Sequence, residues 1–230
     1  MHRPPFTVRP LALSVTLAIA TPVAVAADIA ASAVASPQEV NNVVLTASDN
    51  VISVATEVTG IIKEQNDTNS TQLIKQGAGT LSLTNNNTYK GGTDVQAGTL
   101  SVARAASLGD GVVNLAGGST LETQSSTTLT QDITLDGNVT IKTGGQNAAE
   151  NITQITSAIT EKDKQNGNSS LTKSGAGTLS LTADNAYKGN TTISEGTLAI
   201  SRGGSLGSGS EIKIENGATL KTNQNVTINQ

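Results

Sequence analysis

The string GAGTLSLT occurs twice in this chain, at Gly77 to Thr84 and again 98 positions later at Gly175 to Thr182. The identity extends beyond the string, because residues 73–109 align without a gap on residues 171–207 with 22 identical residues in 37 positions. An internal duplication in a glycine-rich chain predicts a fold made of stacked repeats.

The composition restricts the secondary structure of these repeats. Only 1% of the residues are aromatic and 36% are hydrophobic, so the core must consist of Leu, Ile, Val and Ala. After residue 30 no long amphipathic run has the 3.6-residue period of a helix. The sequence therefore favours an all-β fold.

Apolar residues recur with a shorter period inside the duplication. Near Leu81 and Leu83 they alternate with Thr and Ser, which is typical of a strand with one buried face. Short strands of this kind bury that face only when coils stack. The sequence predicts a right-handed parallel β-helix, a solenoid of roughly 20-residue coils, with about five coils per duplication. The steps that support this period are 19, 21, 20, 18 and 20 residues, between Leu81, Leu100, Leu121, Ile141, Ile159 and Leu179.

Glycines fall between the predicted strands, where the chain must turn. The two tyrosines occupy the same repeat position, and we expect their rings to pack on a neighbouring coil with the hydroxyls reaching water. The predicted structural positions are Gly77, Gly79, Leu81, Leu83, Tyr89, Gly91, Gly98 and Leu100 in the first copy and Gly175, Gly177, Leu179, Leu181, Tyr187, Gly189, Gly196 and Leu198 in the second.

The N-terminus has the layout of a secretory signal peptide. Two arginines precede an apolar run from Leu11 to Ala20, which is followed by the helix breaker Pro22 and small residues. This pattern predicts cleavage between Ala26 and Ala27 or one residue later. The alternatives are a buried helix or a membrane anchor, for which the apolar run is short.

The sequence predicts three parts of the chain. Residues 1–26 form the signal peptide, residues 27–50 a flexible lead-in or N-terminal cap, and residues 51–230 a β-helix with two long repeats at about 51–148 and 149–230. The polar segment 144–170 is expected to be a coil with an exposed loop and a short helix near Asn147 to Ile152. The chain stops on a predicted strand, so we expect the C-terminal end to be incomplete.

Several chemistries are disfavoured by composition. Cysteine is absent, and the sole histidine, His2, lies in the predicted signal peptide, so neither thiolate nor histidine chemistry is expected. We predict no catalytic residue, no cofactor and no metal site. Asp132 and Asp136 are the remaining acid–base candidates, but QDITLDGN is better interpreted as a strand and a turn. The net charge of −4 becomes −6 when Arg3 and Arg9 leave with the signal peptide, which disfavours nucleic acid as a partner.

The segments Leu73 to Leu100 and Leu171 to Leu198 resemble the autotransporter-associated β-strand repeat, also called the passenger-associated transport repeat. Its pattern is roughly LTKxGxGTLxLxxxNxYxGxTxIxxGTL, and both copies match at nearly every fixed position. The departures are Ile74, Ala186 and Asn190, which put the geometry of single corners in question.

This resemblance implies an exported passenger segment of a Gram-negative autotransporter. The implied partners are Sec-type export machinery and an outer-membrane β-barrel translocator, which this chain does not contain. The implied location is the cell surface or the medium, reached through the periplasm. In this family the repeat is thought to assist vectorial secretion and folding, so the leading expectation is a structural stalk.

Two alternatives remain open. The first is an adhesin whose exposed loops, such as segment 144–170, contact a host-cell or bacterial surface ligand. The second is a polysaccharide-acting β-helix enzyme that uses Asp132 or Asp136, although carbohydrate sites usually also contain aromatic platforms and this segment offers only two tyrosines.

Overall fold

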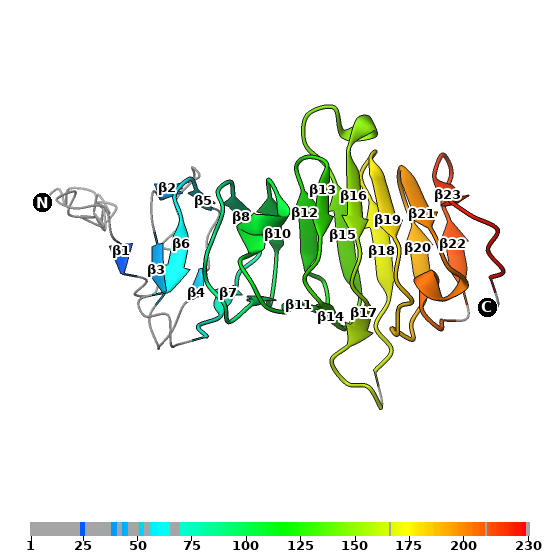
Figure 1. The fold of residues 1–230 in the computed structure, drawn as a ribbon, viewed down its shortest axis with the longest axis horizontal. Coiled ribbons are helices and arrows are strands. Elements are labelled where there is room, and N and C mark those ends of the chain that lie inside the picture. The colour runs from blue at the N-terminus through cyan, green and yellow to red at the C-terminus, as the bar shows by residue number, and fades with distance from the viewer. Residues whose placement is uncertain are drawn as a thin grey trace, which may run out of the picture.

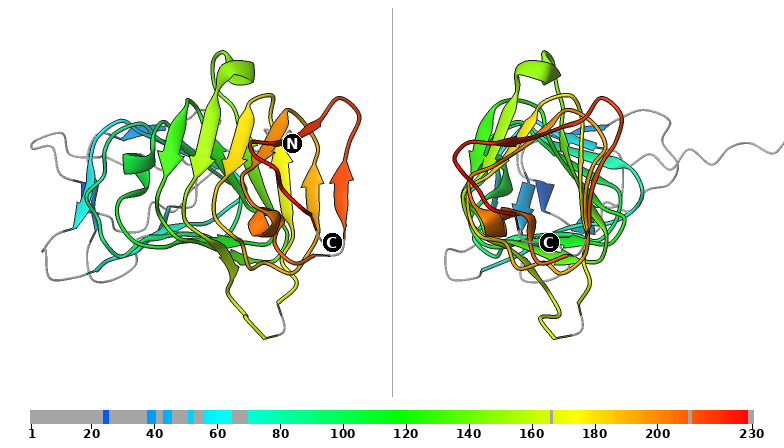
Figure 2. Two further views of the ribbon diagram at one scale, coloured as in Figure 1. Left: turned by 45° about the vertical axis from the view of Figure 1, so that its right-hand side comes forward. Right: turned by 90° about the vertical axis from the view of Figure 1, so that its right-hand side faces the viewer.

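The computed structural model describes residues 24–25, 38–40, 43–45, 51–52, 56–64, 70–165, 167–209 and 211–228. Their strands form four sheets in which neighbouring strands run parallel. The sheets run along an elongated stack of coils (Figure 1), and the view along the stack shows the coils superposed around one common interior (Figure 2). The predicted all-β parallel solenoid is confirmed.

Three long sheets form three sides of the solenoid. The nine-stranded sheet contains, in spatial order, β2 (Gln38–Val40), β5 (Thr56–Val58), β8 (Thr80–Leu83), β10 (Thr99–Val102), β12 (Thr120–Thr123), β15 (Val139–Thr143), β18 (Leu171–Ser174), β20 (Thr191–Ile193) and β22 (Ile212–Ile214). The six-stranded sheet contains β17 (Ile159–Glu161), β14 (Ile133–Asp136), β11 (Val113–Ala116), β9 (Thr93–Val95), β7 (Leu73–Lys75) and β4 (Val51–Ile52). The five-stranded sheet contains β13 (Thr127–Leu129), β16 (Ile152–Ile155), β19 (Thr178–Leu181), β21 (Thr197–Ile200) and β23 (Thr219–Thr222).

The remaining elements are short. A three-stranded sheet of β1 (Ala24–Val25), β3 (Val43–Leu45) and β6 (Ile62–Glu64) lies near the N-terminal end. The described residues also form three 3-10 turns, Ala105–Leu108, Ala148–Glu150 and Gly203–Leu206. Among the described residues there is no helix of the length and apolarity needed to cross a bilayer.

The core consists of aliphatic side chains stacked from coil to coil. Strand pairing places Leu81 beside Leu100, then Leu121, then Ile141, and all four are fully buried. The outward neighbours of Leu81, Thr80 and Ser82, are polar and at least partly exposed. Burying one such side chain stabilises the fold by about 1.5–3 kcal/mol. The stack thus supplies the stability that a single coil lacks.

The apolar ladder does not continue from Ile141 to Ile159 and Leu179, as the sequence period predicted. Ile141 lies beside Lys173 on the nine-stranded sheet, Ile159 beside Ile133 on the six-stranded sheet, and Leu179 beside Thr153 on the five-stranded sheet. The prediction of about five coils per duplication is therefore wrong. Strands on all three sides have the same apolar alternation, so spacing along the chain does not distinguish one side from another.

The second copy is displaced around the solenoid by one side. Strand β8 with Leu81 belongs to the nine-stranded sheet, whereas β19 with Leu179 belongs to the five-stranded sheet. Four coils separate Leu81 from Lys173, and one further side separates Lys173 from Leu179. The same local sequence thus forms the same corner on two different sides.

The polar segment 144–170 supplies the long coil that causes this displacement. It contains β16 and β17 and two excursions, one with the 3-10 turn Ala148–Glu150 and one between β17 and β18. Figure 1 shows both excursions projecting beyond the outline of the neighbouring coils, above and below. The expected exposed loop is present, and a short 3-10 turn lies in the region of the expected helix. Strand β17 begins at Ile159, a position of the predicted period, whereas β16 was not predicted.

Candidate functional site

Each copy of the duplication holds four polar side chains at equivalent places. We call Glu64, Lys75, Asn87 and Tyr89 the first repeat clamp, and Glu161, Lys173, Asn185 and Tyr187 the second repeat clamp. Seven of these residues are less than 10% exposed, and Glu64 is half-buried. A buried polar group costs free energy unless it is hydrogen-bonded, so the partners of these groups define what the clamps do.

The two lysines join consecutive corners of the chain. Lys75 Nζ donates to the carbonyl oxygens of Gln76 (2.7 Å), Gly77 (2.7 Å) and Ala97 (3.1 Å). Lys173 Nζ makes the same contacts with Ser174 (2.8 Å), Gly175 (2.6 Å) and Glu195 (3.0 Å). An ammonium group has three donors, and all three are used.

Burial changes the acidity of both lysines. Desolvation lowers the pKa of Lys75 and of Lys173 to about 8, because the charged form loses hydration in the interior. For Lys173 the charge of Glu195 acts weakly in the opposite direction. Both lysines lie at inward positions of their strands, two residues after Leu73 and Leu171. This inward position, repeated in both copies, was the signal that our sequence reasoning missed.

The two asparagines bridge the coil below to the coil above. Asn87 Oδ1 accepts from Ile62 N (2.8 Å), and Asn87 Nδ2 donates to Ser107 O (2.5 Å). Asn185 repeats this with Ile159 N (2.8 Å) and Ser205 O (2.5 Å). Each asparagine therefore connects three consecutive coils through a single side chain.

The tyrosines are fully buried, so the expectation that their hydroxyls reach water is wrong. Tyr89 Oη lies 2.6 Å from Thr93 Oγ1, and that hydroxyl donates to Leu108 O (3.2 Å). Tyr187, Thr191 and Leu206 O repeat the chain at 2.7 and 3.2 Å. Burial raises the pKa of both tyrosines, with the threonine hydrogen bond acting in the opposite direction. The threonine hydroxyl thus satisfies each buried tyrosine hydroxyl without a water molecule.

The two glutamates lie upstream of the string that the sequence analysis singled out. Glu64 Oε1 accepts from Thr71 N and Lys90 N, both at 2.8 Å. Glu161 Oε1 accepts from Ser169 N (2.7 Å) and Lys188 N (2.9 Å). Each carboxylate ties the loop that enters a repeat to the loop one coil later. The sequence analysis did not single out either glutamate.

The glycines of the repeat lie where backbones approach closely. Gly98 and Gly196 have φ of 71° and 67° and stack on the preceding corner: a Cβ on Gly98 would lie 2.4 Å from Gly77 O and 2.5 Å from Gly79 O. Gly175 and Gly177 take the same positions under Gly196. Gly91 and Gly189 have φ outside the left-handed region. Gly91 presses against the backbone of residues 70–71, and Gly189 presses against the backbone of Ser169 and the side chain of Ser170. Only glycine satisfies both conditions at Gly98 and Gly196.

The leucines at the predicted repeat positions line the interior. They are 0 or 1% exposed at Leu81, Leu83, Leu100, Leu179, Leu181 and Leu198. The clamps thus sit within the same core that the leucines build. Ala26 and Ala27, the predicted cleavage positions, lie outside the described residues.

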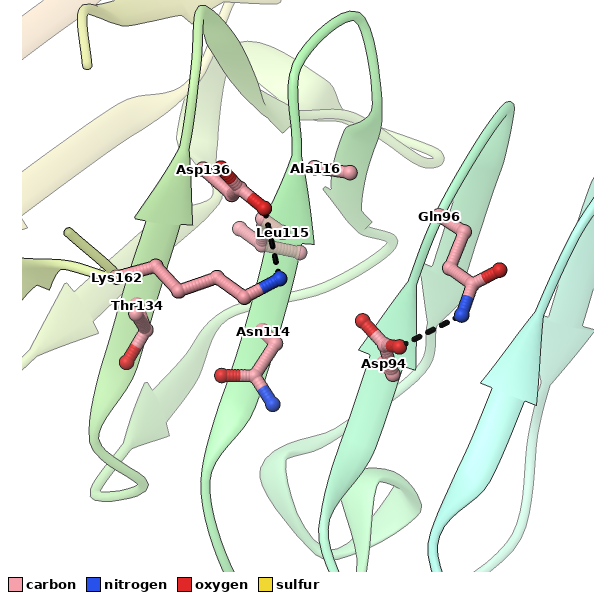
Figure 3. Close-up of a pocket in the computed structure, with 8 residues that line it drawn as sticks. All are labelled: Asp94, Gln96, Asn114, Leu115, Ala116, Thr134, Asp136 and Lys162. Atoms are coloured by element: carbon pink, nitrogen blue, oxygen red, sulfur yellow. Dashed lines mark hydrogen bonds and ion pairs between the residues drawn. The ribbon is translucent and has the colours of Figure 1, made fainter. Parts of the chain in front are cut away.

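A shallow polar groove lies on the outer face of the six-stranded sheet (Figure 3). Its volume is about 160 Å³, and its lining is Asp94, Gln96, Asn114, Leu115, Ala116, Thr134, Asp136 and Lys162. Lys162 Nζ pairs with Asp136 Oδ2 at 2.8 Å, and Gln96 Nε2 donates to Asp94 Oδ2 at 2.8 Å. The hydrogen bond and charge of Asp136 raise the pKa of Lys162. With two carboxylates and one ammonium, the groove is acidic and suits a small polar or cationic group.

The structure does not bring Asp132 and Asp136 together. Asp136 lines the groove, whereas Asp132 lies before β14 and lines a second hollow with Asp110, Thr130 and Gln131. Asp132 and Asp136 are four positions apart along extended chain, a separation of about 13 Å between their Cα atoms. No group of three or more His, Cys, Asp or Glu side chains gathers within the described residues.

Comparison with known proteins identifies the duplicated segment. Residues 73–102 and 171–200 match the model of the passenger-associated-transport-repeat family. All of Lys75, Asn87 and Tyr89 lie within the first match and Lys173, Asn185 and Tyr187 within the second, while the glutamates of both clamps lie just outside.

The chain is also similar to "Adhesin BmaC autotransporter" of Brucella suis biovar 1 (strain 1330). The two are 35% identical over 173 residues, an alignment that spans 73% of this chain and 4% of the relative. No solved structure matches the chain.

Proposed function

We propose that this chain, an autotransporter passenger segment with two passenger-associated transport repeats on a β-solenoid, is a structural stalk whose repeat clamps assist vectorial secretion and folding at the cell surface. The observation behind the proposal is that each clamp joins three consecutive coils through buried side chains.

Stacked coils stabilise one another only after neighbours have formed. A chain that emerges gradually from a translocator therefore needs places where a few coils are stable together. Asn185 fits this need because it binds Ile159 N in one neighbouring coil and Ser205 O in the other. Folding that proceeds from such points would draw the chain outward, since each added coil buries apolar surface.

The partners and the route follow from this proposal. Residues 1–26 would act as a signal peptide for Sec-type machinery, and the chain would pass through the periplasm to an outer-membrane translocator. Residues 27–50 would then be a lead-in and residues 51–230 the solenoid, with long repeats at about 51–148 and 149–230. In this role the segment needs no catalytic residue and no cofactor.

The test is surface display of the full-length protein with Asn87→Ala and Asn185→Ala combined, measured by protease accessibility on intact cells. We expect display to fall several-fold while total expression is unchanged. Asn114→Ala is the matched control, because Asn114 points outward into the groove and not into the core. Normal display of the double variant would refute the proposed role of the clamps.

A second candidate function is adhesion, which the printed name of the Brucella relative supports. The groove and the two excursions of segment 144–170 are the surfaces that offer polar groups to a host-cell or bacterial ligand. Asp94→Ala with Asp136→Ala, or replacement of residues 144–150 by a short glycine-serine turn, would then abolish adhesion of whole cells and leave display intact. Loss of hydrolytic activity on Asp132→Ala would favour the polysaccharide-acting enzyme instead.

A further inference from the structure

The dipeptide Asn216-Gly217 forms an exposed corner between β22 and β23. Gly217 has φ of 84°, and Ala218 N donates to Glu215 O (3.0 Å), so the dipeptide occupies the two central positions of a turn, as in type II. A Cβ on Gly217 would meet nothing within 4 Å, so the surroundings of this glycine are open. The corner is held at its base and faces solvent at its two central residues.

The corresponding corner of the first copy is Gly117-Gly118, which aligns with Asn216-Gly217. The next coil covers this first corner, because its first amide donates to Asp136 O and its second to Asn138 O, both at 2.7 Å. Among the residues that the structure describes, neither amide of Asn216-Gly217 has an acceptor. One copy thus shows the corner covered, and the other shows it uncovered.

An asparagine followed by glycine loses its side-chain amide when the next main-chain nitrogen attacks it. The nitrogen of Gly217, after giving up its proton, attacks Cγ of Asn216. The new C–N bond closes a five-membered succinimide, and the Cγ–Nδ2 bond breaks as the leaving amino group takes up a proton and departs as ammonia. Water then opens either carbonyl of the ring and leaves aspartate or isoaspartate. Glycine favours this intramolecular attack because it has no Cβ to hinder the approach.

Hydrogen bonding of the attacking nitrogen decides which corner reacts. A main-chain N–H that donates to a carbonyl must break that hydrogen bond before its nitrogen attacks, as in the covered corner of the first copy. Within the described residues Gly217 N carries no such bond. The strands on either side stay paired through Glu215 N to Ile193 O and Thr219 N to Gly196 O, both at 2.9 Å. The reaction therefore needs motion of the turn alone.

We propose that Asn216 is a site of spontaneous deamidation, which proceeds while the corner Asn216-Gly217 is uncovered and stops when another coil covers it. The product carries a new negative charge and, in the isoaspartyl form, one more methylene in the main chain. Both changes fall on the corner that, in the first copy, binds the next coil. Deamidation therefore marks chains in which this corner has stayed open. The inference does not depend on the proposed role of the repeat clamps.

The experiment is incubation of the purified, folded chain at mildly alkaline pH, followed by peptide mapping with mass spectrometry. Asn216 is expected to convert to aspartate and isoaspartate several-fold faster than Asn138 and Asn223, which are also exposed but precede residues larger than glycine. Asn216→Gly, which restores the glycine pair of the first copy, is expected to abolish the modification of this peptide. Gly217→Ala keeps the asparagine and is expected to slow its conversion several-fold.

Gly117→Asn tests the role of coverage, because it builds the same dipeptide at the corner that the next coil covers. A Cβ at this position would lie 3.3 Å from Asp136 O, so a small shift accommodates the side chain. In the folded chain, position 117 is expected to react several-fold more slowly than Asn216, and in concentrated urea the two positions are expected to react at similar rates.

Two results would overturn the proposal. The first is wild-type Asn216 reacting no faster than Asn138 and Asn223, a comparison that stands whether or not Gly117→Asn folds. The second is equal reaction at positions 117 and 216 in a variant that circular dichroism shows to be folded.

Discussion

At the scale of residues, the sequence shows which apolar side chains face inward, but it does not show which groups the buried polar side chains bind. The alternation around Leu81 and Leu83 predicted their strand, because apolar spacing records which side chains face inward. The partners of Lys75 and Asn87 could not be predicted, since they lie 20 to 25 residues away on neighbouring coils or on main-chain atoms of the adjacent corner. Lysine is usually exposed, so only the inward position of Lys75 and Lys173 in their strands indicates that they are buried.

The asparagine of each repeat clamp should contribute more to the free energy of unfolding than an exposed asparagine of the same size. Asn185→Ala leaves Ile159 N and Ser205 O without their partners in a buried place, and an unsatisfied buried group costs about 1–3 kcal/mol. We expect urea unfolding of the purified chain to show a loss of that order. Asn114→Ala, on the outer face, should change the free energy of unfolding by less than about 0.5 kcal/mol. Equal effects of the two substitutions would contradict the clamp.

The buried lysines predict that stability rises with pH above about 8. Their pKa is about 8 in the folded chain and 10.5 when unfolded, so between these values the unfolded state binds more protons. The free energy of unfolding should therefore increase from pH 7.5 to pH 9.5, on the order of 1 kcal/mol per lysine. Measurements stop at pH 9.5 because unfolded tyrosines begin to ionise near pH 10. Lys75→Met with Lys173→Met should abolish the increase, and a flat wild-type profile would refute the argument.

At the scale of elements, the sequence predicted strands and corners but not the side to which a strand belongs. Leu179 was placed in line with Ile141, whereas it lies beside Thr153 on another sheet. All three sides use the same two-residue alternation, so only the number of residues in each coil separates them. The coil from Ile141 to Lys173 is long because it holds two polar excursions in addition to its strands. Loop length therefore set the displacement of the second copy.

The corner glycines allow the effect of a close backbone contact on stability to be separated from the effect of a positive φ. Gly98 and Gly118 both have positive φ, at 71° and 81°, but a Cβ on Gly118 would meet nothing within 4 Å. Gly98→Ala therefore combines strain with a clash against Gly77 O and Gly79 O, while Gly118→Ala introduces strain alone. We expect Gly98→Ala to lower the melting temperature clearly more than Gly118→Ala. A similar decrease for both would mean that φ alone decides.

At the scale of the whole molecule, the solenoid is a stack in which contacts reach only neighbouring coils. Stability in such a stack is local, and it should be highest where a repeat clamp joins three coils. Copy one and copy two lie on different sides and several coils apart, so each should act alone. The central claim is therefore that each repeat clamp stabilises only its own neighbouring coils, and not the solenoid as a whole.

Hydrogen exchange of the Asn185→Ala variant, followed by mass spectrometry and compared with wild type, tests that claim most directly. The account predicts faster exchange at Ile159, whose amide loses its acceptor, and in the turn Gly203–Leu206, with protection of residues 70–110 unchanged. Faster exchange along the entire stack, or unchanged exchange at Ile159 and in that turn, would contradict it.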